Sequence, residues 1–278
     1  MTIDHTVVGF TAEPVRKKWT KKDAIIYALG IGAGTDDLQF TTDNTKGASQ
    51  KCLPTFAVIV GSGGQPFAKL GEFDLAKLVH GGQGIELFAD IPPEGEVETV
   101  SRISAIWDKG TSAIVEMTSE STDASTGKPL MRTVSSLFFR GEGGWGGDRG
   151  PTSKVLFPER EADFVSTLKT RDDQPLIYRL SGDRNPLHTD PAFAQRAGFT
   201  RPILHGLCTY GFTGRALLEH ACGGDVGKFG AFRGKFSKPV YPGDELTVSI
   251  WREGTSFLFR TQSQNGTVVF DEGVFTLR

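Results

Sequence analysis

The second half of the chain repeats the first in outline, and this repeat restricts the possible folds more than any other feature. Trp107-Asp-Lys-Gly-Thr-Ser112 is echoed by Trp251-Arg-Glu-Gly-Thr-Ser256, and Tyr27-x-Leu29 is echoed by Tyr178-x-Leu180. Each Trp motif follows a Pro/Gly turn and a segment of alternating, strand-like residues. A repeat on this scale predicts two units of similar topology.

Each half combines a helical pattern with a run of strand patterns. In the first half we expect a helix over residues 24–30, a polar loop over 35–52, and strands over 85–88, 97–107, 111–119 and 130–140. In the second half we expect a helix from Pro202 to about Cys222, followed by strands over 246–250, 256–263 and 267–277. The apolar run 53–61 takes the place of that second helix in the first half, but its length fits a helix or a strand equally well. The duplicated pattern predicts the α+β class, with two curved antiparallel sheets that each wrap a buried helix.

A glycine-rich segment separates the halves. Residues 141–151 hold six glycines in eleven positions, a composition that disfavours helix and strand. We interpret it as a junction between an N-terminal domain, 1–140, and a C-terminal domain, 152–278. A phosphate-binding loop is disfavoured here because no helix pattern begins directly after it.

Charge and cysteine content exclude several classes. A net charge of −2 gives no basic field for nucleic acid or a membrane surface, and no apolar run is long enough to span a bilayer. The three cysteines form no pair with metal-binding or redox spacing, so we expect no metal site and reduced thiols in the cytoplasm. The first residues carry charges throughout and lack the apolar core of a secretion signal.

Residues 182–188 combine an acid and a base within a constrained loop. Pro186 fixes its own φ and keeps Asn185 out of the α region, so the segment is expected to be a shaped loop rather than a helix. Such a loop can direct the carboxylate of Asp183 and the imidazole of His188 at one water molecule. As ordinary structural residues, Asp183 would be a turn former and Asp190 would cap the turn that follows.

The segment after this loop is expected to begin a helix beside it. Gly206 lies near that helix start and has no side chain, so a substrate oxygen could approach its N–H closely. His205 is expected to serve a structural hydrogen-bonding role, and Tyr178 is expected in the core. A second glycine-rich stretch, 30–34, follows a helical rather than a strand pattern and is therefore interpreted as a flexible loop, not a nucleotide site.

The run Tyr178-x-Leu180-x-Gly182-Asp183-x-Asn185-Pro186-Leu187-His188-x-Asp190-Pro191-x-Phe193-Ala194 resembles the signature of the (R)-specific 2-enoyl-CoA hydratases. These are the "hydratase 2" enzymes of the MaoC-like dehydratase family, in their two-domain form. The resemblance implies a double hot-dog fold and the reversible syn hydration of trans-2-enoyl-CoA to (3R)-3-hydroxyacyl-CoA. It also implies a place in fatty acid metabolism, such as β-oxidation.

The resemblance also implies residue roles. Asp183 and His188 activate the water, Asn185 helps to place it, and the Gly206 N–H serves as the oxyanion hole. Matched motifs place substrate contacts at the residues His80, Gly81, Lys109, Arg184 and Phe236. No cofactor is implied, because CoA is part of the substrate.

The first half lacks the Gly-Asp-x-Asn-Pro-Leu-His loop, so one active site per chain is expected. By resemblance, the degenerate first half takes a medium or long acyl chain, and two chains form a homodimer. Two other functions remain open: a hot-dog acyl-CoA thioesterase, and a non-catalytic module that binds acyl-CoA or an acyl carrier protein.

Overall fold

Ten strands carry the fold. The first half contributes β1 (Val15–Trp19), β2 (Leu78–Leu87), β3 (Gly95–Asp108), β4 (Ser112–Asp123) and β5 (Pro129–Arg140). The second half contributes β6 (Phe164–Lys169), β7 (Phe229–Phe236), β8 (Glu245–Glu253), β9 (Ser256–Ser263) and β10 (Val268–Leu277). This computed structural model describes residues 3–64, 66–74, 77–152 and 154–278. The expected strands are present, but the one expected over 85–88 begins earlier, at Leu78.

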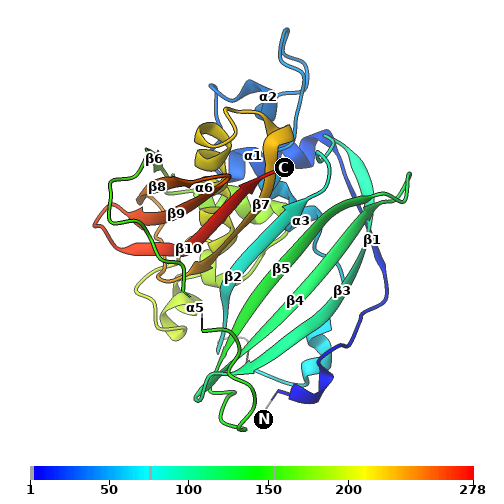
Figure 1. Cartoon of the computed structure of the whole chain (residues 1–278), viewed down its shortest axis with the longest axis vertical. Helices are drawn as coiled ribbons and strands as arrows, with labels where there is room; N and C mark the ends of the chain where they lie inside the picture. The colour runs from blue at the N-terminus through cyan, green and yellow to red at the C-terminus, as the bar shows by residue number, and fades with distance from the viewer. Residues whose placement is uncertain (1–2, 65, 75–76, 153) are drawn as a thin grey trace.

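The strands form a single antiparallel sheet in the order β1-β3-β4-β5-β2-β7-β10-β9-β8-β6 (Figure 1). Read outward from the centre, each half follows the same order, so that β2 corresponds to β7, β5 to β10 and β1 to β6. The halves meet where Gly82 pairs with Lys235 and Glu86 pairs with Ala231. The predicted duplication is thus confirmed, although the two sheets are continuous rather than separate.

The helices are α1 (Lys21–Gly30), α2 (Leu38–Thr41), α3 (Ala57–Val60), α4 (Gln174–Tyr178), α5 (Pro191–Arg196) and α6 (Gly206–His220). Single 3-10 turns are η1 (His5–Val7), η2 (Pro54–Phe56), η3 (Pro66–Leu70), η5 (Arg179–Ser181), η6 (Pro186–His188) and η7 (Val226–Lys228). The helix α1 begins where a capping box forms between Thr20 and Asp23. In the described part of the chain, no helix has both the length and the apolar character needed to cross a membrane.

Two expectations about the first half require revision. The segment 35–52 is not wholly a loop, because α2 lies within it. The undecided run 53–61 is helical, but it consists only of η2 and the single turn of α3. The first half therefore has a much shorter central helix than the 15-residue α6 of the second half.

In Figure 1 α6 lies behind the strands of the second half, and ten of its fifteen residues are buried. Gly211 and Gly214 of α6 allow close packing, and their main neighbours are first-half residues rather than the sheet. A Cβ on Gly211 would lie 2.4 Å from Ile31, and one on Gly214 would lie 2.3 Å from Thr55. The supposedly flexible loop 30–34 is accordingly packed, with Ile31 fully buried.

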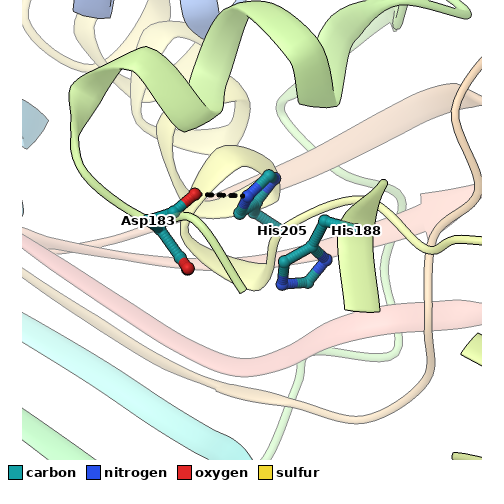
Figure 2. A group of neighbouring side chains, drawn as sticks. All are labelled: Asp183, His188 and His205. Atoms are coloured by element: carbon teal, nitrogen blue, oxygen red, sulfur yellow. Dashed lines mark hydrogen bonds between the residues drawn. The ribbon is translucent and has the colours of Figure 1, made fainter. Parts of the chain in front are cut away.

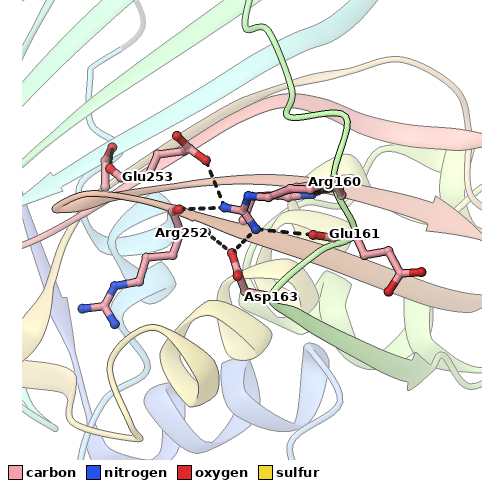
Figure 3. A network of polar contacts seen from close by, with 7 residues as sticks. Arg160, Glu161, Asp163, Arg252 and Glu253 are labelled. Atoms are coloured by element: carbon pink, nitrogen blue, oxygen red, sulfur yellow. Dashed lines mark hydrogen bonds and ion pairs between the residues drawn. The ribbon is translucent and has the colours of Figure 1, made fainter.

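The connection between the halves is held at both ends by the two Trp motifs. The Asp108 carboxylate accepts hydrogen bonds from the backbone N–H groups of Gly144 and Gly146, which lowers its pKa to about 2. At the other end, Arg160 binds Asp163, Glu253 and the backbone carbonyl of Arg252 (Figure 3). The glycine-rich segment thus folds back on the first half instead of forming an open linker.

Candidate active site

The loop that carries Asp183 has a defined shape. Gly182 has a φ of +125°, a conformation that side chains disfavour, and the chain turns there after η5. The Asn185 N–H donates to the Asp183 carboxylate at 3.1 Å, and the Asn185 side-chain oxygen accepts from the Leu187 N–H at 3.0 Å. Asn185 has a ψ of 123°, outside the α region as expected, but residues 186–188 form the 3-10 turn η6 rather than irregular loop. Asn185 therefore shapes the loop directly.

His188 is held as a neutral base. Its ring is buried, with 8% of its surface exposed, and Nδ1 lies 2.8 Å from the Ile203 carbonyl oxygen. A carbonyl can only accept, so Nδ1 carries the proton and Nε2 keeps its lone pair. Burial also lowers the pKa of His188, which favours the neutral ring near neutral pH.

His205 lies against both catalytic candidates (Figure 2). Its ring stacks on that of His188 with centroids 3.8 Å apart, and its Nε2 donates to the Asp183 backbone carbonyl at 3.2 Å. Burial and the nearby His188 lower the pKa of His205 to about 3. No hydrogen-bond partner of His205 Nδ1 is found among the described residues. The structural role expected for His205 agrees with this hydrogen bond, but the stacking on His188 could not be predicted from sequence spacing.

The helix α6 begins at Gly206, four residues later than expected at Pro202. The reason is local pairing: the Leu204 N–H donates to the Val240 carbonyl at 2.8 Å, which keeps the chain extended up to His205. Gly206 is consequently the first helical residue. Backbone N–H groups at this position have no acceptor within the helix, so Gly206 offers a donor beside His205.

A second wall of this site is formed where the two halves meet, by Phe236 of the second half and His80 of the first. Phe236 of β7 packs over Gly206, where a Cβ would lie 3.5 Å from its ring. The ring of His80, on the neighbouring strand β2, meets Phe236 edge-on at 5.2 Å. Burial lowers the pKa of His80 to about 4, and Gly81 is the extra residue where the β2–β5 register shifts. His80, Gly81, Phe236 and Gly206 are therefore brought together.

The remaining two expected CoA contacts are Lys109 and Arg184. Lys109 occupies the β3–β4 turn, where its ammonium group donates to the Arg149 carbonyl. Arg184 is exposed and directly follows Asp183. Their contacts with CoA phosphates therefore stay predictions.

Asp190 and Tyr178 are structural residues, as expected. The Asp190 side chain caps α5 by accepting from the backbone N–H groups of Ala192 and Phe193. Tyr178 is fully buried, and its ring lies 4.9 Å from the ring of His205.

A pocket of about 330 Å³ opens beside Asp183 and runs into the first half. The second half lines it with Ser181, Gly182, Asp183 and Leu207. Most of its wall comes from the first half, which contributes both apolar side chains, Val58, Ile59, Pro66, Phe67 and Met117, and polar ones, Lys17, Ser62, Gln83, Ser101, Ser119, Thr133 and Ser135. Such a pocket is within the size range of small-molecule sites. In the sequence, hydroxyl residues at alternating positions of the expected strands are the pattern that could have indicated these polar side chains.

The carboxylate of Asp183 and one ring nitrogen each of His188 and His205 lie within 4.8 Å of one another. This set could hold a divalent ion. One nitrogen of each ring is already bound to a backbone carbonyl, so each histidine has a single nitrogen available. The acid–base chemistry described above does not require a metal.

Similarity to known proteins covers the whole chain. Residues 18–141 match the MFE-2 hydratase 2 N-terminal domain, and residues 154–274 match the MaoC-like domain. The chain is 45% identical to 3-hydroxyacyl-thioester dehydratase Y of Mycobacterium tuberculosis over 98% of both chains. It is 38% identical to the probable enoyl-CoA hydratase 2 of Dictyostelium discoideum, over 99% of this chain and 96% of that protein.

A solved structure shows the same architecture. The MaoC-like dehydratase from Phytophthora capsici superposes with a TM-score of 0.89 at 32% identity, over 100% of this chain and 98% of that one. The class of this protein follows from three findings together: the duplicated sheet, the loop that carries Asp183 and His188, and these similarities. The chain belongs to the MaoC-like dehydratase family, in its two-domain hydratase 2 form.

Proposed function

We propose that the chain catalyses the reversible syn hydration of trans-2-enoyl-CoA to (3R)-3-hydroxyacyl-CoA. The observation that carries the proposal is the pairing of Asp183 with a neutral His188 beside the free amide of Gly206. Relatives named enoyl-CoA hydratase 2 support the same reaction. The R configuration rests on the family alone.

His188 acts first as a base and then as an acid. Its Nε2 lone pair accepts a proton from a water molecule whose oxygen bonds to C3 of the substrate. The Asp183 carboxylate accepts a hydrogen bond from the other hydrogen of this water and so fixes its position. His188 then returns the proton to C2 on the same face, which makes the addition syn. Asn185 helps to place this water by holding Asp183, a role that the hydrogen bond from its N–H to the Asp183 carboxylate supports.

The Gly206 N–H stabilises the charge that develops on the thioester oxygen. An enolate-like oxygen forms there when water attacks C3. The loss of a donor of this kind typically costs on the order of 100–1,000-fold in rate. His80 from the first half and Phe236 from the second half close the same space, which supports their assignment as substrate contacts.

The surroundings of the reaction follow from the same proposal. The acyl chain, medium or long, enters the first-half pocket beside Asp183. Only water and protons are exchanged, so the reaction requires no cofactor. The three free, buried cysteines suit a reducing cytoplasm.

We further propose a homodimer. It is supported by the exposed side chains of Leu29, Leu176 and Leu180 on contacting helices, and light scattering measures its molar mass.

Loss of enoyl absorbance with trans-2-decenoyl-CoA measures the activity, and stereospecific dehydrogenases assign the product. We expect Asp183→Asn and His188→Gln to lose more than about 1,000-fold in kcat, because each removes a group in contact with the water. Asp225→Asn is the matched control. Like Asp183, Asp225 accepts through its side chain from the N–H two residues on, at 3.0 Å, but it lies on η7. EDTA is expected to leave the rate unchanged.

The other two functions give different results in this assay. Release of free CoA from a saturated acyl-CoA, without hydration of the enoyl-CoA, would indicate a thioesterase. Tight binding of enoyl-CoA without turnover would indicate a non-catalytic module.

A further inference from the structure

The open face of the first-half sheet differs in chemistry from its counterpart. In the second half, α6 covers the sheet, and the facing strand residues include the buried apolar side chains of Val248, Phe259 and Phe270. In the first half, the single turn of α3 leaves part of the sheet uncovered, and the pocket lies there. A plain hydrocarbon tail would gain the most free energy of burial against an apolar lining such as that of the second half.

Beside apolar side chains such as Ile59 and Met117, hydroxyl and amide side chains line this pocket in two cross-strand rows. Ser101 of β3 pairs with Ser119 of β4 in the sheet register, and their hydroxyls lie 2.6 Å apart. In the adjacent row, Gln83 of β2 pairs with Ser135 of β5, whose hydroxyl donates to the Gln83 side-chain oxygen at 2.8 Å. The polar wall therefore extends across four neighbouring strands.

These side chains keep unused hydrogen-bonding capacity toward the pocket. The Ser101 hydroxyl donates to the Gly63 carbonyl, so Ser119 must donate to Ser101, and the Ser119 oxygen can accept a further bond. One N–H of the Gln83 amide donates to the Gly84 carbonyl at 3.0 Å, which leaves its second N–H. The wall thus offers both a donor and an acceptor.

Lys17 adds a positive charge to the same pocket. Its ammonium donates to the Ile59 carbonyl at 2.6 Å and the Ser62 hydroxyl at 3.4 Å, which leaves a third N–H. Its neighbours Arg16 and Lys18 form ion pairs with Glu98 and Glu96, whereas no ion pair of Lys17 is found among the described residues. Burial also lowers the pKa of Lys17, which indicates a poorly solvated cation.

Lys17 and Asp183 line the same pocket, Lys17 from β1 of the first half and Asp183 from the loop of the second half.

We propose that the acyl tail of the substrate carries oxygen, as a hydroxyl, keto or carboxylate group placed along or at the end of the chain. The inference rests on the proposed hydration and adds the chemistry of the tail. The Gln83 amide and the Ser119 oxygen bind a tail hydroxyl or keto group, and the Lys17 ammonium binds a terminal carboxylate.

The test compares three trans-2-dodecenoyl-CoA thioesters whose tails end in methyl, hydroxyl or carboxylate. We expect kcat/KM to be about 10-fold higher for both oxygenated tails than for the methyl tail, equivalent to about 1.4 kcal/mol. If no thioester is hydrated, the proposed function fails. In that case, calorimetry of the same three compounds still tests the tail preference, because their dissociation constants show which tail binds most tightly. An equal or stronger preference for the methyl tail would overturn the inference and leave hydration standing.

Matched variants separate the parts of the pocket. Lys17→Met is expected to remove the advantage of the carboxylate tail, whereas Lys18→Met, which changes an exposed neighbour, is expected to keep it. Ser119→Ala is expected to reduce the advantage of the hydroxyl tail. Its control is Ser121→Ala on the same strand. This variant removes a buried hydroxyl that lies 2.7 Å from the Thr99 hydroxyl. If the variants changed all three tails equally, the assigned contacts would be wrong.

Discussion

At the level of single residues, His205 connects the parts of the site. Its ring stacks on the base His188, its Nε2 binds the backbone of Asp183, and its own backbone precedes the Gly206 amide. His205 does not touch the reacting atoms in the proposed mechanism. It is a positioning residue, because movement of its ring would displace the acid, the base and the oxyanion donor together.

Two variants separate the functions of the His205 ring. His205→Phe keeps an aromatic ring for stacking but loses the donor, and His205→Gln keeps a donor but loses the stack. We expect His205→Phe to lower kcat by about 10-fold with little change in KM, because the lost hydrogen bond contributes about 1 kcal/mol to the placement of Asp183. Partial recovery in His205→Gln would assign the effect to the hydrogen bond. Wild-type kcat in both variants would refute the positioning role.

The sequence predicts the reacting groups of the site but not their partners. Asp183 and His188 follow from the quoted signature, since the spacing within a short loop limits where they point, and Gly206 follows from the expected helix start and the family resemblance. The Ile203 carbonyl that fixes the His188 tautomer depends on how the chain folds back, which spacing does not encode. His80 illustrates the difference: the motif matched it to the substrate, but only the β2–β7 pairing places it beside Phe236.

At the level of elements, α6 both positions the site and joins the halves. Its first residue supplies the oxyanion donor, and a turn and a half later Gly211 packs against Ile31 of the first half. The start of α6 was mispredicted because the proline rule describes local preference only. The tertiary Leu204–Val240 hydrogen bond outweighs that preference and delays the helix by one turn.

The Gly211 contact can be tested by adding a single methyl group. An alanine there would gain about 1 kcal/mol from helix propensity alone. Its Cβ, however, would lie 2.4 Å from Ile31, so the two segments must separate. We expect Gly211→Ala to lower the free energy of unfolding by a net ~1–2 kcal/mol in urea denaturation, because overpacking outweighs propensity. Gly206→Ala, whose Cβ would meet only ordinary contacts at 3.5 Å, is the control on the same helix. A more stable Gly211→Ala protein would contradict the packing argument.

At the level of the whole molecule, the duplicated halves have taken different tasks. The second half keeps a long central helix and supplies the acid, the base and the oxyanion donor. The first half keeps the same strand order but only one turn of helix, and the space left over forms the pocket. The repeat and the missing loop made this division predictable from sequence. The polar character of the pocket was not predicted, because alternating serines on a strand can face solvent or a cavity.

The concentration of buried histidines at this junction makes the folded state sensitive to acid. Burial lowers the pKa of His80 to about 4 and that of His205 to about 3, and it also lowers the pKa of His188. In the unfolded chain these rings titrate near the ordinary value of about 6.5. Below that pH the unfolded chain binds protons that the folded chain excludes. The stabilisation is therefore complete above about pH 6.5 and decreases as the pH falls toward the folded-state values.

We expect the free energy of unfolding to fall between about pH 6.5 and pH 4.5, with a slope that approaches ~1.4 kcal/mol per pH unit for each of His80 and His205. Urea denaturation at a series of pH values measures this slope. His80→Gln should remove the contribution of one histidine to this dependence of the unfolding free energy on pH, because the variant has no imidazole to protonate at that position. A free energy of unfolding that stayed constant over this range would mean that the rings take up protons without unfolding. The neutral state assigned to His188 as the base would then be wrong as well.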